Sequence, residues 1–332
     1  MKNRIAIDLG SSFTKIYKSQ ADVVLYEPTC VAIEKNNYQN PIAFGYEAEK
    51  MIGKTTNNVK VIYPVKGVEI TDEKALKVII TEYISRVRAS FEFKPDILFL
   101  VTCGATRESI KNFERVFNLA GYYNIDYAES VSLAMVGANG PRDNASTSFI
   151  IDLGGSQTTV CALTMQGVIS GVSAEYGGNV LNNLIVNQLK VEQNLSISEN
   201  QAEELKVKIA SLKEEDGTKM VVYGKDASSS KPKTMQISSQ DIYDSVKTFA
   251  DKVIEIANII ITSLNEETIL DIHTNGILLV GGGSLIYGIK DYIENALSFK
   301  VIVPKESEIV ASIGSGIVIE DKALYNKFKM KV

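Results

Sequence analysis

Apolar and polar positions form short blocks along the first half of the chain. Apolar-rich runs at residues 5–8, 14–18 and 23–33 are separated by turn residues and predict a three-stranded antiparallel meander. Residues 96–101 form a strongly apolar run that predicts a buried strand, and residues 106–120 have the apolar periodicity of a helix. The pattern predicts a sheet that is covered by helices.

The second half of the chain repeats this order. Runs at residues 148–152, 158–165 and 168–174 predict another meander, residues 239–264 predict one long helix, and residues 276–280 predict a strand. A meander, a helix, a strand and a helix therefore occur twice. The repetition predicts a duplicated α/β architecture, in which a ligand commonly binds between the halves.

A polar linker at residues 139–144 separates the two halves. We predict domain I at residues 1–140 and domain II at residues 145–320. Domain I is expected to contain a small subdomain near residues 34–70, and domain II an inserted subdomain near residues 193–237. A basic tail is expected at residues 321–332.

Composition narrows the class of protein. The chain has 332 residues, a net charge of −5 and no dense basic stripe, which argues for two domains and against direct nucleic-acid binding. Its three cysteines form no CxxC pair and His273 is the single histidine, so neither a zinc site nor a disulfide framework is expected. No leader peptide precedes the first strand and no apolar run approaches a membrane span, which predicts a cytoplasmic protein.

Two Asp-Leu-Gly turns carry the strongest chemical signal. Asp8 and Asp152 stand 144 positions apart (152 minus 8), each after an apolar run. Glycine in such a turn lets backbone N–H groups converge on an anion. One turn alone is equally a plain hairpin, but two matching turns favour a nucleoside triphosphate, with both aspartates holding Mg²⁺ through water. The residues expected to bind phosphate are Gly10, Ser11, Ser12, Lys15, Gly154, Gly155 and Ser156.

A glycine-rich turn follows the strand predicted at residues 276–280. Backbone without side chains can lie flat against an adenine or an α-phosphate, although the same residues also make an ordinary tight turn. The turn consists of Gly281, Gly282, Gly283 and Ser284.

Three charged residues are weaker candidates. Glu203 and Lys206 share one helix face and would reach a ribose and a phosphate; the alternative is a solvated ion pair. Glu129 opens a helix of small residues, where an acid would orient a water toward a γ-phosphate or would simply favour the helix N-terminus.

Two segments suggest contact with a surface. Phe91 and Phe93 lie in a short loop between a predicted helix and strand, and they either contact a membrane or partner or fold back onto the domain. The tail at residues 321–332 interleaves lysines with apolar residues and would bind anionic lipid weakly.

In this order, the two acidic turns, the small-residue helix and the triple glycine resemble the actin/Hsp70/sugar-kinase superfamily of ATPases. Within it the chain resembles the MreB family of bacterial actins. Residues 202–206 (Ala-Glu-Glu-Leu-Lys) are similar to that family's Ala-Glu-Glu-Ile-Lys. Further similar stretches, at residues 26–33, 45–55, 63–70 and 280–288, extend the resemblance over nearly the whole chain.

The resemblance implies a duplicated ribonuclease-H-like (actin-like) fold, with four subdomains around a cleft that binds ATP or ADP with Mg²⁺. Glu129, Asp152 and Gln157 would act in hydrolysis, with Glu129 positioning the attacking water. The loop with Phe91 and Phe93 falls where the family carries a membrane-insertion loop, which favours lipid as its partner. Members of the family form membrane-associated filaments, often as antiparallel pairs.

The second turn departs from the family's usual sequence. Ser156 stands in place of a glycine, Gln157 in place of a threonine that helps to orient water, and Thr159 in place of a glutamate. These changes affect the expected rate of hydrolysis rather than nucleotide binding. They are typical of a divergent paralogue. The composition, which lacks Trp and is rich in Asn, Lys and Ile, leads to the hypothesis of an origin in a wall-less bacterium.

We therefore expect an ATP-dependent, filament-forming bacterial actin at the inner face of the cell membrane, acting in cell shape or motility, with slow hydrolysis coupled to polymer turnover. Its expected partners are copies of itself, the membrane, MreB paralogues and proteins of shape or wall synthesis, without direct nucleic-acid contact. The alternatives are a plasmid-partitioning actin and a small-molecule kinase of the same superfamily. The sequence determines neither filament polarity nor adaptor proteins.

Overall fold

The computed structural model describes residues 4–35, 37–54, 58–89, 93–139, 146–213 and 217–330. Contacts divide the chain into two compact units. Unit 1 comprises Met1–Thr147, Leu163–Ser173 and Ile309–Val332, and unit 2 comprises Ser148–Ala162 and Ala174–Glu308. Unit 1 therefore includes Leu163–Ser173 and Ile309–Val332, although both follow the linker expected at residues 139–144. The domain and subdomain limits expected from the sequence remain predictions.

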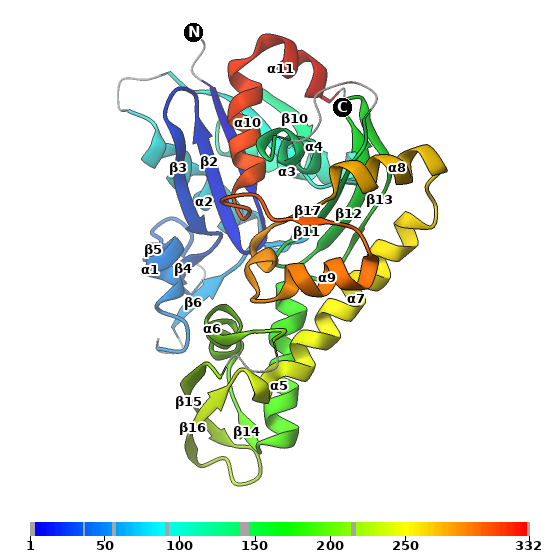
Figure 1. The fold of residues 1–332 in the computed structure, drawn as a ribbon. Coiled ribbons are helices and arrows are strands. Elements are labelled where there is room, and N and C mark those ends of the chain that lie inside the picture. Colours follow the sequence, from blue (N-terminus) through cyan, green and yellow to red (C-terminus); the bar gives the residue numbers. More distant parts are fainter. Residues whose placement is uncertain are drawn as a thin grey trace. The chain divides into compact units, whose positions relative to one another are not determined.

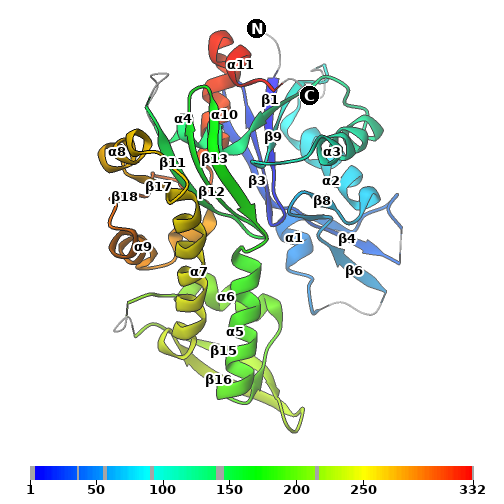
Figure 2. The same ribbon diagram turned by 90° about the vertical axis from the view of Figure 1, so that its right-hand side faces the viewer.

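Unit 1 contains a five-stranded sheet with the order β10-β9-β1-β2-β3, whose strands are labelled in Figures 1 and 2 together. β1 pairs antiparallel with β2, and β2 with β3, while β9 runs parallel to both β1 and β10. The strands are β1 (Arg4–Leu9), β2 (Phe13–Lys18), β3 (Asp22–Pro28), β9 (Asp96–Val101) and β10 (Ile125–Glu129). Alternate residues of β1, Ile5 and Ile7, enter a core that they share with α2 (Glu73–Val87) and α3 (Arg107–Leu119).

Two helices far apart in sequence cross closely within unit 1. α4 (Ser130–Gly137) packs against α10 (Val310–Glu320), which also contacts β1, β2 and β3 (Figures 1 and 2). A Cβ added to Gly314 would overlap the carbonyl oxygen of Leu133 and lie 2.7 Å from the backbone nitrogen of Gly137. Hydrogen takes the place of a side chain at both glycines, so the two backbones can touch.

A small sheet with the order β5-β4-β6 precedes α2. Its strands are β4 (Val31–Glu34), β5 (Ala43–Phe44) and β6 (Val59–Ile62), and α1 (Gly45–Glu49) packs against β4 and β5. A short hairpin of β7 (Val65–Lys66) and β8 (Glu69–Ile70) leads into α2. Cys30, Ala32 and Ala48 form the core of this region and are fully buried.

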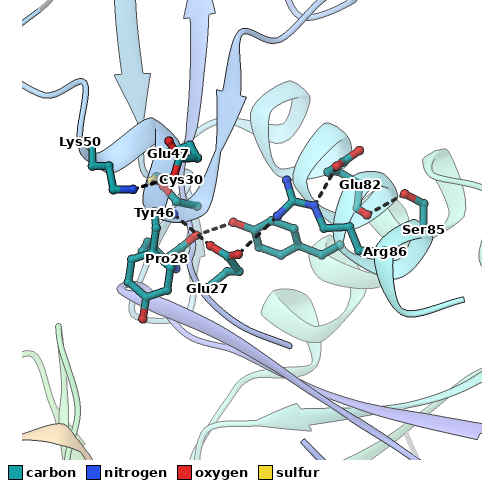
Figure 3. Close-up of polar contacts among 11 residues, drawn as sticks. Glu27, Pro28, Cys30, Tyr46, Glu47, Lys50, Glu82, Ser85 and Arg86 are labelled. Atoms are coloured by element: carbon teal, nitrogen blue, oxygen red, sulfur yellow. Dashed lines mark hydrogen bonds and ion pairs between the residues drawn. The ribbon is translucent and has the colours of Figure 1, made fainter. Parts of the chain in front are cut away.

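Glu27, the residue before the last of β3, connects three elements of unit 1 (Figure 3). Its carboxylate accepts a hydrogen bond of 2.9 Å from the backbone N–H of Tyr46 in α1 and pairs with Arg86 of α2 at 3.4 Å. Arg86 is held in turn by Glu82 at 2.8 Å. Because Phe44 at the N-cap of α1 provides no side-chain cap, Glu27 satisfies an N–H group at that helix start.

Glu27→Ala is expected to lower the free energy of unfolding by about 1–2 kcal/mol, because it leaves the Tyr46 N–H unpaired. Glu47→Ala removes a neighbouring acid whose ion pair with Lys50 is exposed, with side chains 72 % and 67 % accessible, and should leave stability unchanged. Urea denaturation of both variants makes the comparison. Equal losses in the two variants would contradict a capping role for Glu27.

The second sheet has the order β13-β12-β11-β17-β18. Its strands are β11 (Ser148–Leu153), β12 (Thr158–Thr164), β13 (Gly167–Ala174), β17 (Ile277–Val280) and β18 (Val301–Ile302). β17 runs parallel to β11 and to β18. As in the first sheet, three consecutive strands are followed by parallel strands that arrive after helices. The fold is therefore the predicted duplicated α/β fold.

Five helices and a small sheet complete unit 2 among the residues that the structure describes. The helices are α5 (Gly178–Glu192), α6 (Glu199–Ile209), α7 (Tyr243–Ile261), α8 (Glu266–Asn275) and α9 (Ile289–Leu297). The small sheet contains β14 (Leu195–Ser196), β15 (Lys219–Asp226) and β16 (Pro232–Ser238). α7 buries Val246, Phe249, Val253, Ile256 and Ile260, a helical spacing that directs one face into the unit 2 core.

The prediction of a single strand at residues 23–33 is wrong. β3 ends at Pro28 and β4 begins at Val31 in a different sheet. Between them the backbone N–H of Cys30 donates to the carbonyl of Pro28 at 2.8 Å, and that of Thr29 donates to Ser12 at 2.8 Å. These bonds make a tight turn at Pro28, a residue that commonly ends a strand and that the prediction of one continuous strand did not take into account.

Two helix predictions also require correction. The helix expected at residues 239–264 starts as a 3-10 turn, Gln240–Ile242, and becomes α7 only at Tyr243. A further helix, α8, follows it and was not predicted; Asn265 caps its N-terminus by accepting from the N–H of Thr268 at 2.9 Å. Polar residues at this cap have the composition of a loop, which conceals a helix start.

Much of the tail is folded. Asp321 caps α11 (Lys322–Phe328), and Tyr325 and Phe328 are buried in unit 1. Asp126 accepts a hydrogen bond from the hydroxyl of Tyr325 and pairs with Lys329 at 2.6 Å. Within the described ranges, no helix has both the length and the apolar character needed to cross a membrane.

Candidate functional site

The first acidic turn joins β1 to β2. Asp8 is the residue before the last of β1, and the backbone N–H of Gly10 donates to the carbonyl of Phe13 at 2.9 Å, which closes the turn. Ser11 and Ser12 form its tip and are half-buried. The local fold therefore presents backbone N–H groups and hydroxyls beside a carboxylate, as phosphate binding requires.

Lys15 neutralises the carboxylate of this turn. Its Nζ lies 3.0 Å from Asp8 Oδ2, and the side chains are only 17 % and 20 % exposed. The antiparallel register of β1 and β2 places the two residues opposite each other. Thr14, the neighbour of Lys15 on β2, points to the opposite face of the sheet. It is 2 % exposed and its hydroxyl bonds to that of Thr29 at 2.8 Å, so it is part of the buried interior.

The second turn has the same closing backbone hydrogen bond as the first, beside an aspartate at the same place in its strand. Asp152 is the residue before the last of β11, and the N–H of Gly154 donates to the carbonyl of Gln157 at 2.9 Å. A Cβ added to either Gly10 or Gly154 would lie 3.0 Å from the acceptor oxygen of its turn. The repeat in the sequence thus corresponds to a repeat in geometry, including the backbone bond that closes each turn.

The second turn is also bound to the start of α5. The N–H of Gly178 donates to Gly154 at 3.0 Å and that of Asn179 donates to Gly155 at 2.7 Å. Ser156 and Gln157 complete the turn and are half-buried. These bonds hold the tip beside the N-terminus of a 15-residue helix, whose partial positive charge favours an anion. Gly178 was not among the site residues predicted from the sequence, although a glycine pair that opens a helix after a meander was the available signal.

The glycine turn after β17 lies against the second acidic turn. Gly281 has φ +81°, and a Cβ there would overlap the carboxylate of Asp152 and lie 2.6 Å from the carbonyl of Leu153. Gly283 also faces Leu153, whereas a Cβ on Gly282 would meet nothing within 4 Å. Ser284 is 6 % exposed and donates to Gly281 at 2.7 Å, so its hydroxyl maintains the turn.

Glu203 and Lys206 form an ion pair on α6. Lys206 Nζ lies 2.6 Å from Glu203 Oε2 and 3.2 Å from the carbonyl oxygen of Gly178. The lysine side chain is 14 % exposed and the glutamate 44 % exposed. The pair therefore differs from a solvated surface pair, because the lysine also connects α6 to the start of α5.

Glu129 is the last residue of β10 and the N-cap position of α4. Burial raises the pKa of its carboxyl, and a hydrogen bond with Ser132 partly opposes this change. Burial and the nearby Glu129 carboxylate raise the pKa of Cys103 to about 11, which keeps this thiol neutral at pH 7. A carboxylate with a raised pKa is suited to accept a proton from water.

The aromatic loop is described only in part. Phe91 lies outside the described residues. Phe93 is 92 % exposed and precedes Lys94, whose Nζ donates to the carbonyl of Gly121 at 2.8 Å. The Phe93 side chain is thus directed to the surface of unit 1.

Known proteins match this chain over nearly its full length. The cell shape-determining protein Mbl of Bacillus subtilis is 25 % identical over 328 residues, covering 98 % of each chain. The crystal structure of MreB5 of Spiroplasma citri bound to ADP superposes with a TM-score of 0.92 at 25 % identity, covering 98 % of each chain. The MamK double helical filament shares the fold, with a TM-score of 0.80 at 19 % identity, over 96 % of this chain and 99 % of that one.

A family model described as MreB/Mbl protein matches residues 2–327. With the duplicated actin-like fold and its two equivalent acidic turns, this match shows that the chain belongs to the MreB/Mbl family of bacterial actins.

Proposed function

We infer that the protein is an ATP-dependent, filament-forming cytoskeletal ATPase that associates with the membrane. The observation that carries this proposal is the exact repetition of the bonds from Gly10 to Phe13 and from Gly154 to Gln157, each beside an aspartate. Two such turns suit the phosphates of one nucleotide better than two ordinary hairpins. That MreB5 of Spiroplasma citri was crystallised with ADP supports the proposal.

In this proposal the turns at Asp8 and Asp152 bind phosphate through backbone N–H groups. Lys15 adds a positive charge beside the phosphates. Glu203 and Lys206 contact the ribose, and the backbone of the glycine turn at Gly281 lies against the base. The two carboxylates fit Mg²⁺, which keeps most of its water and needs one or two carboxylates. When bound, the ion would neutralise phosphate charge.

Glu129 and Gln157 have the proposed roles in hydrolysis. The raised pKa of the Glu129 carboxyl favours transfer of a proton from water, and Gln157, in the second turn, would orient that water. Because an amide cannot accept a proton as a carboxylate does, Gln157 acts by hydrogen bonding alone.

Self-association and membrane contact complete the proposal. The chain shares its fold with the MamK double helical filament, and in this proposal its copies assemble through head-to-tail contacts, which propagate because they do not close. Phe93, with an exposed fraction of 92 %, is the proposed lipid contact together with Phe91. α11 turns Tyr325 and Phe328 inward, so these two side chains are not available for lipid contact. Localisation at the inner membrane face, an origin in a wall-less bacterium and partners beyond copies of itself remain predictions.

We expect ATP, but not buffer alone, to move the protein into the pellet on ultracentrifugation and to produce filaments in electron micrographs. Asp8→Asn should raise the ATP concentration needed by at least about tenfold, because it removes a carboxylate that is proposed to hold Mg²⁺ and that positions Lys15. Asp22→Asn, a matched change at an exposed aspartate of the same unit, should behave as the original protein does. A monomeric protein at high concentration with ATP would refute filament formation, and turnover that requires an added acceptor would indicate a kinase.

A further inference from the structure

Asn182 on α5 is buried with one half of its amide unsatisfied. It is 7 % exposed, and its Nδ2 donates to Glu203 Oε2 at 2.7 Å. Its Oδ1 is inaccessible and finds no hydrogen-bond donor among the residues that the structure describes. A buried acceptor without a donor is costly, so an apolar side chain would fill this position at lower cost. We therefore attribute the presence of an amide at this buried position to its hydrogen bond with Glu203.

Two donors converge on the same oxygen of Glu203. Besides Asn182, Lys206 contacts Oε2 at 2.6 Å, and Lys206 also bonds to the carbonyl of Gly178 at 3.2 Å. One donor belongs to α5 and the other to α6, so the carboxylate is held from two helices. Glu203 remains 44 % exposed despite these bonds.

The geometry points to Asn182 as a positioning residue that orients the Glu203 carboxylate toward the ribose hydroxyls of the nucleotide, an assignment that rests on the proposed nucleotide site. Glutamate has three rotatable side-chain bonds, and its contact with Lys206, which is itself anchored at Gly178, still lets the carboxylate rotate about that one contact. The short Asn182 side chain comes from a different, packed helix and removes that freedom before the ligand arrives. An ordered carboxylate then accepts hydrogen bonds from hydroxyl groups without a further ordering cost.

The test compares ATP with 2′,3′-dideoxy-ATP, which lacks both ribose hydroxyls. We expect the original protein to bind ATP about tenfold or more tightly than the dideoxy compound, as bonds to a charged acceptor imply. In Asn182→Leu the affinity for ATP should fall until the ratio is below about threefold, with the affinity for dideoxy-ATP unchanged. Isothermal titration calorimetry measures both affinities, and retained dideoxy-ATP binding shows that the variant is folded.

Asn183→Leu is the matched control, because it makes the same chemical change one residue away, at an exposed position of the same helix. It should keep the original ratio. In a Glu203→Gln background, Asn182→Leu should cause no additional loss, because both changes act on one carboxylate. The assignment is overturned if Asn182→Leu weakens both ligands in parallel or changes neither, or if the original protein does not distinguish them. Failure of the original protein to bind either nucleotide would instead refute the nucleotide site itself.

Discussion

Gly314→Ala is expected to lower the free energy of unfolding by about 3 kcal/mol, at the upper end for an added methyl group. The new Cβ would overlap the carbonyl oxygen of Leu133 and lie 2.7 Å from the backbone nitrogen of Gly137. Backbone atoms cannot rotate away as the end of a side chain can, so α4 and α10 must separate. Because α10 also packs on β1, β2 and β3, the displacement would disturb the sheet of unit 1.

Differential scanning calorimetry should show this loss as a decrease in melting temperature of roughly 5–10 °C. Gly282→Ala is the control, because a Cβ there meets nothing within 4 Å. Gly137→Ala should be similarly destabilising, but the double variant should cost less than the sum, since the first methyl already parts the helices. An unchanged melting temperature in Gly314→Ala would show that α4 and α10 do not touch at this point.

Glu129→Gln is expected to reduce the rate of ATP hydrolysis roughly 10²–10⁴-fold, the usual contribution of a general base. The amide has the size of the carboxylate but does not accept a proton from water. Nucleotide affinity should stay nearly unchanged, because the proposed phosphate contacts lie in the Asp8 and Asp152 turns. Release of inorganic phosphate, together with a binding titration, measures the two quantities. Unchanged turnover would remove Glu129 from the mechanism.

The pH dependence gives this prediction a second measurement. Burial raises the pKa of Glu129, so the carboxylate protonates and hydrolysis should fall at a higher pH than an ordinary glutamate would give. The same shift affects stability. The folded state holds the proton more tightly than the unfolded state, so stability is greatest below the unfolded pKa and is lost as pH rises through the folded pKa. Glu129→Gln should therefore be at least as stable as the original at pH 7, which separates lost chemistry from unfolding.

The acidic turns and most secondary structure could be predicted because they depend on neighbours in the sequence. Asp8-Leu9-Gly10 and Asp152-Leu153-Gly154 contain their own turn chemistry, and the structure closes both with the same backbone bond. The ion pair of Glu203 and Lys206 is local too, since residues three apart share a helix face. The apolar periods likewise identified the duplicated order of strands and helices.

The prediction of secondary-structure elements failed where a distant contact overrides the local pattern. Pro28 indicates a break within residues 23–33, but only the structure shows that the turn after it is bonded to Ser12 and that β4 joins a different sheet. The tail at residues 321–332 has the lysine-rich composition of a loose segment. Its segment Lys322–Phe328 nevertheless folds as α11, and Asp126, about 200 positions away, accepts a hydrogen bond from Tyr325 and pairs with Lys329.

By itself, then, the sequence determined the duplication, the two acidic turns and the family to which their order belongs. Only the tertiary structure revealed Asn182, which reaches Glu203 because α5 packs on α6. Only the structure showed that Ser284 is buried in its own turn and that Gly314 must be a glycine. The physical reason is the same in each case. Hydrogen bonds and close contacts between elements depend on which helices and strands pack against each other, and the order of residues along the chain does not by itself specify that packing.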